Sequence, residues 1–206
     1  MTLTAAELAI YAGALLILFL TPGPVWVAVV ARTLSGGFHA AWPLALGVAV
    51  GDVVWPIAAI LGISWITSVF AGFMTFLRYG ASLIFILMGV AIIRNAGAAI
   101  ASNNRLTRPG ILAGFAAGVA VILSNPKAIL FYMGVLPGFF DLTNLTGLDI
   151  AIIISLSAIV PFAGNLFLAA LVLKIRGRMT SPSALKRIAL SSGFMLICVG
   201  VIIPLI

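Results

Sequence analysis

The chain has 206 residues, of which 64% are hydrophobic and only 7% are charged, and its mean hydropathy is +1.32. Since a soluble domain carries about 25% charged residues, this composition excludes a soluble globular domain and indicates an integral membrane protein. Cys198 and His39 are the only cysteine and histidine, which excludes an intrachain disulfide and argues against ligation of metal or haem by paired histidines. We therefore expect no cofactor, no metal site and no enzymatic activity.

Six apolar segments are long enough to cross a bilayer, which requires roughly 20 residues per helix. They are approximately residues 7–31, 40–63, 72–93, 110–137, 148–173 and 187–206. These segments fill most of the chain and predict an all-α integral membrane protein with six transmembrane helices in a single domain, residues 1–206. Because the opening MTLTAAE contains no basic residue, a cleaved signal peptide is not expected.

The first segment is interrupted by FLTPGPVWV at residues 19–27. Thr21 and Pro22 have the pattern of an N-cap followed by proline at the first helical position, which predicts a helix start within the membrane. A helix start leaves amide N–H groups unpaired, and its dipole, equivalent to roughly half a positive charge, attracts an anion. The candidate substrate-binding residues here are Thr21, Pro22, Gly23 and Pro24. The alternative is a proline kink that neighbouring helices stabilise.

The second segment carries an aspartate, Asp52, in the stretch GVAVGDVVWP. A carboxylate costs on the order of 2.5–3.5 kcal/mol at the bilayer centre, so it is expected to face the protein interior or a cavity. A buried carboxylate can also carry a proton. We therefore predict Asp52 as the proton-coupling residue.

The fourth segment is interrupted in the same way by ILSNPKAIL at residues 122–130. Asn125 and Pro126 repeat the pattern of an N-cap and a first-position proline, and Lys127 is a second charge at membrane depth. All three are candidate substrate-binding residues. Lys127 could instead form a purely structural ion pair with Asp52.

Small and polar residues add further expectations. Two glycine pairs have the GxxxG spacing that lets helices approach closely, within one chain or in a homodimer: Gly47 and Gly51, and Gly114 and Gly118. Trp26 is a candidate for substrate contact. Tyr132 and Asn165 could line the same cavity or could bond to a neighbouring helix.

The charges predict the orientation in the membrane. Basic residues concentrate in alternate loops: Arg32, Arg94, Arg105, Arg108, Lys174, Arg176, Arg178, Lys186 and Arg187. The opposite side has Glu7, Asp141 and Asp149, with Arg78 at the outer end of the third segment. The positive-inside rule places the basic loops in the cytoplasm and both termini outside. The net charge of +7 then reflects orientation and contact with lipid headgroups, and no nucleic-acid partner is expected.

The two halves of the chain, residues about 1–100 and about 105–206, are predicted to be inverted repeats. An offset of about 102 residues superposes Pro24 on Pro126, and three spans per half give the halves opposite orientations, as in inverted-repeat transporters. The interrupted helices are then the first and the fourth, and their breaks lie at similar depth from opposite directions.

Three motifs, FLTPGPVWVAV, GVAVGD and SNPKAILFYMGVLPGFF, together resemble those of the LysE/RhtB family of bacterial amino-acid exporters, and the resemblance covers essentially the whole chain. It implies export of amino acids or related small metabolites across the inner membrane, with coupling to the proton gradient. The residues that match the family's motifs are Thr21–Pro24, Gly51, Asp52 and Asn125–Lys127. The resemblance does not name the substrate.

We expect a zwitterionic amino acid to bind with its carboxylate at the half-helix starts near Gly23–Pro24 and Pro126–Lys127. Asp52 then holds its ammonium group or the coupling proton. The alternatives are an uncoupled facilitator or channel, a transporter of another small metabolite or ion, a membrane enzyme, and an assembly subunit whose charges pair with a partner protein.

Overall fold

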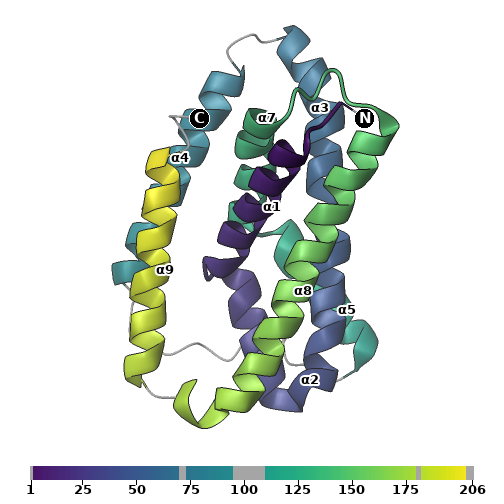
Figure 1. The fold of residues 1–206 in the computed structure, drawn as a ribbon. Helices are drawn as coiled ribbons and strands as arrows, with labels where there is room; N and C mark the ends of the chain where they lie inside the picture. Colours follow the sequence, from purple (N-terminus) through teal and green to yellow (C-terminus); the bar gives the residue numbers. More distant parts are fainter. Residues whose placement is uncertain (1, 70–72, 95–109, 180–181, 203–206) are drawn as a thin grey trace.

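The computed structural model describes residues 2–69, 73–94, 110–179 and 182–202, and all regular elements among them are helical (Figure 1). In chain order they are α1 (Ala5–Leu20), α2 (Pro24–Asp52), α3 (Val54–Val69), α4 (Phe73–Arg94), α5 (Ile111–Leu123), α6 (Pro126–Leu130), the π-helix η1 (Phe131–Val135), α7 (Leu136–Phe139), α8 (Gly147–Met179) and α9 (Pro182–Ile202). Arg105 and Arg108 lie outside the described residues, and the side chains of Arg78, Arg176 and Arg178 are not described.

Two stretches among the described residues are long and apolar enough to cross a membrane, Pro24–Gly62 and Gly147–Ile175. A third candidate is the helix pair Ile111–Leu123 and Pro126–Phe139, which is bent by 50° at its break. Ala5–Leu20 is apolar but shorter. The predicted all-helical membrane architecture is confirmed to this extent, and the count of six spans stays a prediction.

The chain changes direction inside α2, at Gly36 and Gly37. Gly37 has φ +70° and ψ −166°, a conformation that residues with a Cβ rarely adopt and that glycine tolerates. In Figure 1 the chain turns here at the lower end of the molecule and runs back up through the second part of α2 into α3. The boundary expected between residues 31 and 40 is therefore a two-residue turn and not a loop.

The second part of α2 packs directly on α5. A methyl group added at Gly47 would lie 2.1 Å from the carbonyl oxygen of Phe115, and one at Gly118 would lie 2.1 Å from that of Leu44. Both glycine pairs lie at this contact: Gly47, Gly51, Gly114 and Gly118. Only glycine allows backbones to come this close. Because the contact lies within one chain, these glycines give no argument for the expected homodimer.

A second close pair is formed by α4 and α9. A methyl group at Gly89 would lie 2.5 Å from the carbonyl oxygen of Gly193, and the Ser82 hydroxyl donates to the carbonyl of Gly200 at 2.6 Å. On the other side of the molecule, α8 packs against α1 and α2. The described helices therefore include two pairs in close backbone contact, α2 with α5 and α4 with α9.

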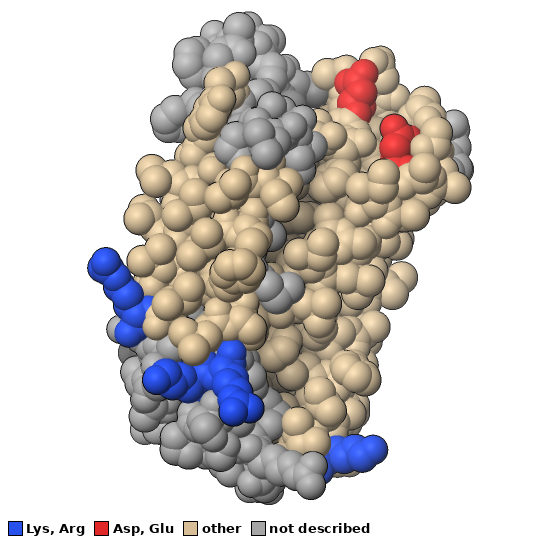
Figure 2. Space-filling model, turned by 60° about the vertical axis from the view of Figure 1, so that its left-hand side comes forward, with Lys and Arg blue, Asp and Glu red and all other residues tan. Residues whose placement is uncertain are grey.

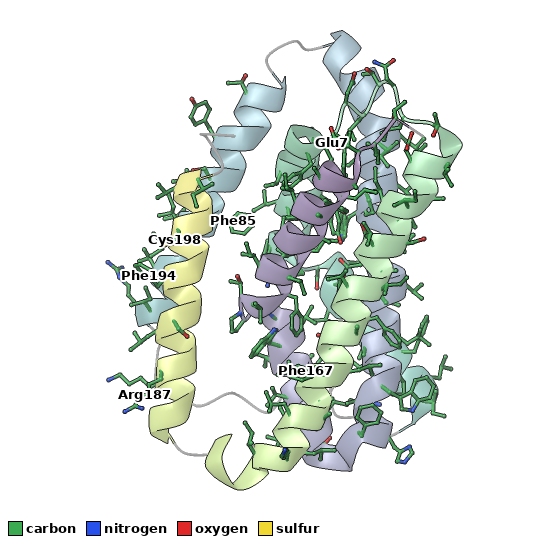
Figure 3. The ribbon with its side chains drawn as sticks, viewed as in Figure 1. Glu7, Phe85, Phe167, Arg187, Phe194 and Cys198 are labelled. Atoms are coloured by element: carbon green, nitrogen blue, oxygen red, sulfur yellow. The ribbon has the colours of Figure 1, made fainter. Side chains whose placement is uncertain are left out.

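Charged side chains gather at opposite ends of the molecule. Figure 2 shows Lys and Arg toward the lower end and Asp and Glu at the upper end of this face. Glu7 lies near the upper end of α1, and Arg187 lies at the lower end of α9 (Figure 3). The first residues of α1 and the last residues of α9 both lie at the upper end (Figure 1). Which end faces the cytoplasm stays a prediction from the positive-inside rule.

Asp149, in the first turn of α8, holds the N-terminal residues. It is fully buried and accepts hydrogen bonds from the backbone N–H of Thr2 at 3.1 Å and the hydroxyl of Thr2 at 2.8 Å. It also accepts from the backbone N–H of Thr146 at 2.9 Å. The start of the chain is therefore fixed to α8 by a carboxylate that the sequence analysis used only for orientation.

Candidate functional site

The first helix break lies where the sequence predicts it, but its capping differs. α1 ends at Leu20, and Thr21 is its C-cap, with the hydroxyl donating to the carbonyl of Ile17 at 2.7 Å. Gly23 is the N-cap of α2 and Pro24 its first residue. The prediction of Thr21 as N-cap and Pro22 as first residue is therefore wrong. A helix starting at Pro22 would place Gly23, the residue before a proline, in the α conformation, which is disfavoured.

The second break has the predicted capping. α5 ends at Leu123, and α6 begins at Pro126 with Asn125 as its N-cap. The side-chain oxygen of Asn125 accepts a hydrogen bond from the backbone N–H of Lys127 at 3.2 Å. The start of α6 is thus satisfied by its own cap, whereas no side chain caps the start of α2.

Lys127 joins the two breaks. Its ammonium donates to the backbone carbonyls of Leu18 at 2.8 Å and Thr21 at 2.5 Å, which belong to the open C-terminal end of α1. Its Nζ lies 3.5 Å from where a Cβ at Gly23 would be. A cation at a helix C-terminus satisfies unpaired carbonyls and interacts favourably with the dipole. This placement explains a lysine at the start of a helix, where the dipole by itself disfavours a cation.

A cavity opens beside this junction. Its volume is about 40 Å³, and about 390 Å³ when all the space out to open solvent is included. Nine of its lining residues are apolar: Leu15, Leu18, Phe19, Val25, Trp26, Val48, Ile122, Ala128 and Pro161. The four polar lining residues are Asp52, Asn125, Lys127 and Asn165. The structure therefore brings residues from both breaks, Asp52 and Asn165 to one cavity.

Two acceptors in the cavity wall have no partner. Among the described residues, the buried side-chain atoms without a hydrogen bond are Asp52 Oδ1, Asn165 Oδ1 and Tyr132 OH. The side chains of Asp52 and Asn165 are 3% and 1% exposed. Because buried polar groups are nearly always hydrogen-bonded, each exception needs an explanation. The alternative of a structural ion pair between Lys127 and Asp52 does not involve Asp52 Oδ1, which has no hydrogen bond. The Lys127 ammonium instead binds carbonyl oxygens at the end of α1.

The start of α2 supplies donors on the same cavity. Its first turn has no side-chain cap, and Val25 and Trp26, the first residues with an N–H, both line the cavity. The indole N–H of Trp26 donates to the carbonyl of Phe19 at 2.6 Å across the break. The cavity thus combines a positive end, at α2 and Lys127, with unsatisfied oxygen acceptors. Among the described residues there is no group of three or more His, Cys, Asp or Glu able to hold a metal ion.

Tyr132, which could line the cavity or bond to a neighbouring helix, is fully buried and is not in the lining. An apolar wall from α1, which includes Leu15, Leu18 and Phe19, was not predicted. Their spacing of three and four residues places them on one helix face, so this signal was present in the sequence. The bond from Lys127 to α1 has no such signal, because its partners lie more than 100 residues away in the chain.

Comparison with known proteins identifies a family of membrane translocators that matches most of the chain. The model of the LysE type translocator matches residues 16–204. An uncharacterized membrane protein of Synechocystis is 32% identical over 92% of this chain and 91% of its own length. A leucine efflux protein of Salmonella typhimurium is 28% identical over 72% of this chain and 71% of its own. A chemotactic transduction protein of Pseudomonas aeruginosa is 30% identical over 61% of this chain and 62% of its own.

No solved structure matches the chain. The family model nevertheless spans nearly all of its length, including both helix breaks and the cavity between them. The chain belongs to the family of LysE type translocators.

Proposed function

We propose that the protein exports amino acids or related small metabolites from the cytoplasm across the bacterial inner membrane, with coupling to the proton gradient. The observation that carries this proposal is the buried carboxylate oxygen of Asp52, which has no hydrogen-bond partner and lines a cavity where two helices break. Buried ionisable residues of this kind mark ion and substrate paths in membrane proteins. The relative named as a leucine efflux protein supports the same class of substrate.

The substrate carboxylate binds at the open start of α2, beside the ammonium of Lys127. That end offers uncapped N–H groups and a fixed positive charge 3.5 Å from the Cβ position of Gly23, and both favour an anion. Asp52 binds either the substrate ammonium or a proton. Because the two compete for one carboxylate, a proton arriving from outside displaces the substrate, which gives antiport.

The helix contacts support two inverted repeats, residues about 1–100 and about 105–206. The fourth predicted span begins with α5, which packs on α2 of the second span. In the same way α8, the fifth span, packs on α1 of the first, and α4 packs on α9. Exchanging the halves leaves this pattern of neighbours unchanged, as an inverted repeat requires. Alternating access to the cavity then uses this pseudo-symmetric arrangement, with both termini outside.

The test is efflux of labelled amino acids from loaded cells, with and without a proton uncoupler. The wild-type protein is compared with Asp52→Asn, and Asp141→Asn is the matched control because it removes an exposed loop carboxylate. We expect uncoupler-sensitive efflux from wild type and Asp141→Asn and its loss in Asp52→Asn. Coupled efflux that survives in Asp52→Asn would refute the coupling role. Efflux that never exceeds the equilibrium distribution would indicate an uncoupled facilitator.

A further inference from the structure

The unpartnered atoms of the cavity are both acceptors and come from different helices. Asp52 Oδ1 lies at the end of α2, and Asn165 Oδ1 lies on α8. Each side chain is at least 97% buried, so water does not freely satisfy them. A primary ammonium group carries three N–H donors and can serve two acceptors at once. The pair therefore fits an ammonium group held between α2 and α8.

The charges of the cavity limit what else a substrate can carry. The described lining contains one carboxylate, from Asp52, one ammonium, from Lys127, two neutral amides, from Asn125 and Asn165, and nine apolar side chains. Lys127 is itself bound to the carbonyls of Leu18 and Thr21. A substrate with a second cationic or anionic group would bury that charge without an opposite charge in this lining, which is strongly unfavourable.

The apolar wall lies on the helices that flank the breaks. Leu15, Leu18 and Phe19 on α1 face the cavity together with Ile122 at the end of α5 and Pro161 on α8. An aliphatic side chain against this wall gains roughly 0.8 kcal/mol for each methylene removed from water. A hydroxyl or a charge in the same place would lose its water without finding a polar partner.

We propose that the cavity selects α-amino acids with an uncharged, aliphatic side chain, and that Asn165 together with Asp52 holds their ammonium group. This rests on the proposed function and assigns a substrate class and a specificity-determining residue to its site. The substrate carboxylate lies at the start of α2, its ammonium lies between Asp52 and Asn165, and its side chain contacts the α1 wall.

The test measures ligand binding by the purified full-length protein, by isothermal titration calorimetry. The probes are L-leucine, L-lysine, L-glutamate, 4-methylpentanoate, which is leucine without its ammonium group, and 3-methylbutylamine, which is leucine without its carboxylate. We expect leucine to bind at least tenfold more tightly than each of the other probes. The two leucine analogues each lack one charged group that the cavity binds, and lysine and glutamate each bury a side-chain charge that has no partner. Lysine or glutamate binding as tightly as leucine would overturn the substrate class.

Asn165→Leu removes the acceptor and keeps the side-chain volume close to that of wild type. We expect about tenfold weaker binding of leucine and unchanged binding of 4-methylpentanoate, with Asn144→Leu, an exposed loop position, as the matched control. If Asn165→Leu does not fold, Asn165→Asp is used, and the added carboxylate is expected to favour 3-methylbutylamine relative to leucine. An unchanged affinity for leucine in Asn165→Leu, or unchanged discrimination in Asn165→Asp, would overturn the role of Asn165.

These outcomes separate the two proposals. Export and binding of a charged amino acid without leucine would overturn the substrate class and leave amino-acid export standing. Absence of binding and of efflux for every amino acid would overturn the proposed function, and this inference with it.

Discussion

Gly118→Ala is the substitution whose cost follows most directly from the structure. Its added methyl group would lie 2.1 Å from the Leu44 carbonyl oxygen, whereas ordinary contact begins at 3.4 Å. The two backbones must therefore separate by the difference, 3.4 − 2.1 = 1.3 Å. A gap of 0.5–1 Å already removes a quarter to a half of the contact energy, and overpacking of this kind costs about 1–3 kcal/mol.

Gly13→Ala is the matched control, because Gly13 lies in α1 with nothing within 4 Å of its Cβ position. Both variants gain the same helix propensity of about 1 kcal/mol, so their difference isolates the steric cost. We expect Gly118→Ala to unfold with a free energy about 1–3 kcal/mol lower than that of Gly13→Ala. Circular dichroism during unfolding in mixed micelles measures this difference. Equal stability of the two variants would refute the close packing of α2 on α5.

Three further predictions concern the breaks and the N-terminus. Gly23→Asp places a carboxylate at the N-cap of α2 beside Lys127, and we expect it to stabilise the fold by about 0.5–2 kcal/mol and to abolish efflux. The control, Gly23→Ala, adds a Cβ that makes only an ordinary contact and should keep efflux. Loss of efflux in both variants would contradict the anion site. Lys127→Met leaves two buried carbonyls unpaired and should lower the free energy of unfolding by about 3 kcal/mol. The control, Thr21→Val, loses one neutral hydrogen bond and should lower it by about 1 kcal/mol. Similar losses in the two variants would contradict the role of the Lys127 ammonium. Asp149→Asn weakens the hydrogen bonds to Thr2 and should speed proteolysis near the N-terminus at least tenfold, as measured by mass spectrometry of limited digests. An unchanged rate of proteolysis would show that this carboxylate does not fix the N-terminus.

Both helix breaks could be located from the sequence because their prolines act locally. A proline lacks the N–H that a helix interior needs and fixes φ near the helical value, so it favours the first position of a helix. It does not mark a start everywhere, because Pro43 and Pro161 lie inside helices. The exact cap of the first break was mispredicted because Pro22 and Pro24 compete for the first position, and the conformation of the residue between them decides the outcome. At the second break there is one proline, and Asn125 caps α6 as expected.

Burial of Asp52 inside the protein could be predicted because a charge exposed to hydrocarbon is costly whatever residues surround it. The partners of Lys127 could not be predicted in this way. Its ammonium binds carbonyls of α1, and backbone acceptors leave no pattern in the sequence, since every residue has one. The turn at Gly36 and Gly37 was also not predicted, because two adjacent glycines are as compatible with a loop as with a sharp bend between two helices.

The contact between α2 and α5 has a consequence for how the cavity opens. With no side chains between the two backbones, sliding or separating them would break many contacts at once, so they move as one rigid unit. Asp52, at the end of α2, belongs to this unit, and so does the start of the second break. The wall that α1 contributes is then the moving part, and the stretch from Thr21 to Gly23 is the hinge that connects α1 to α2.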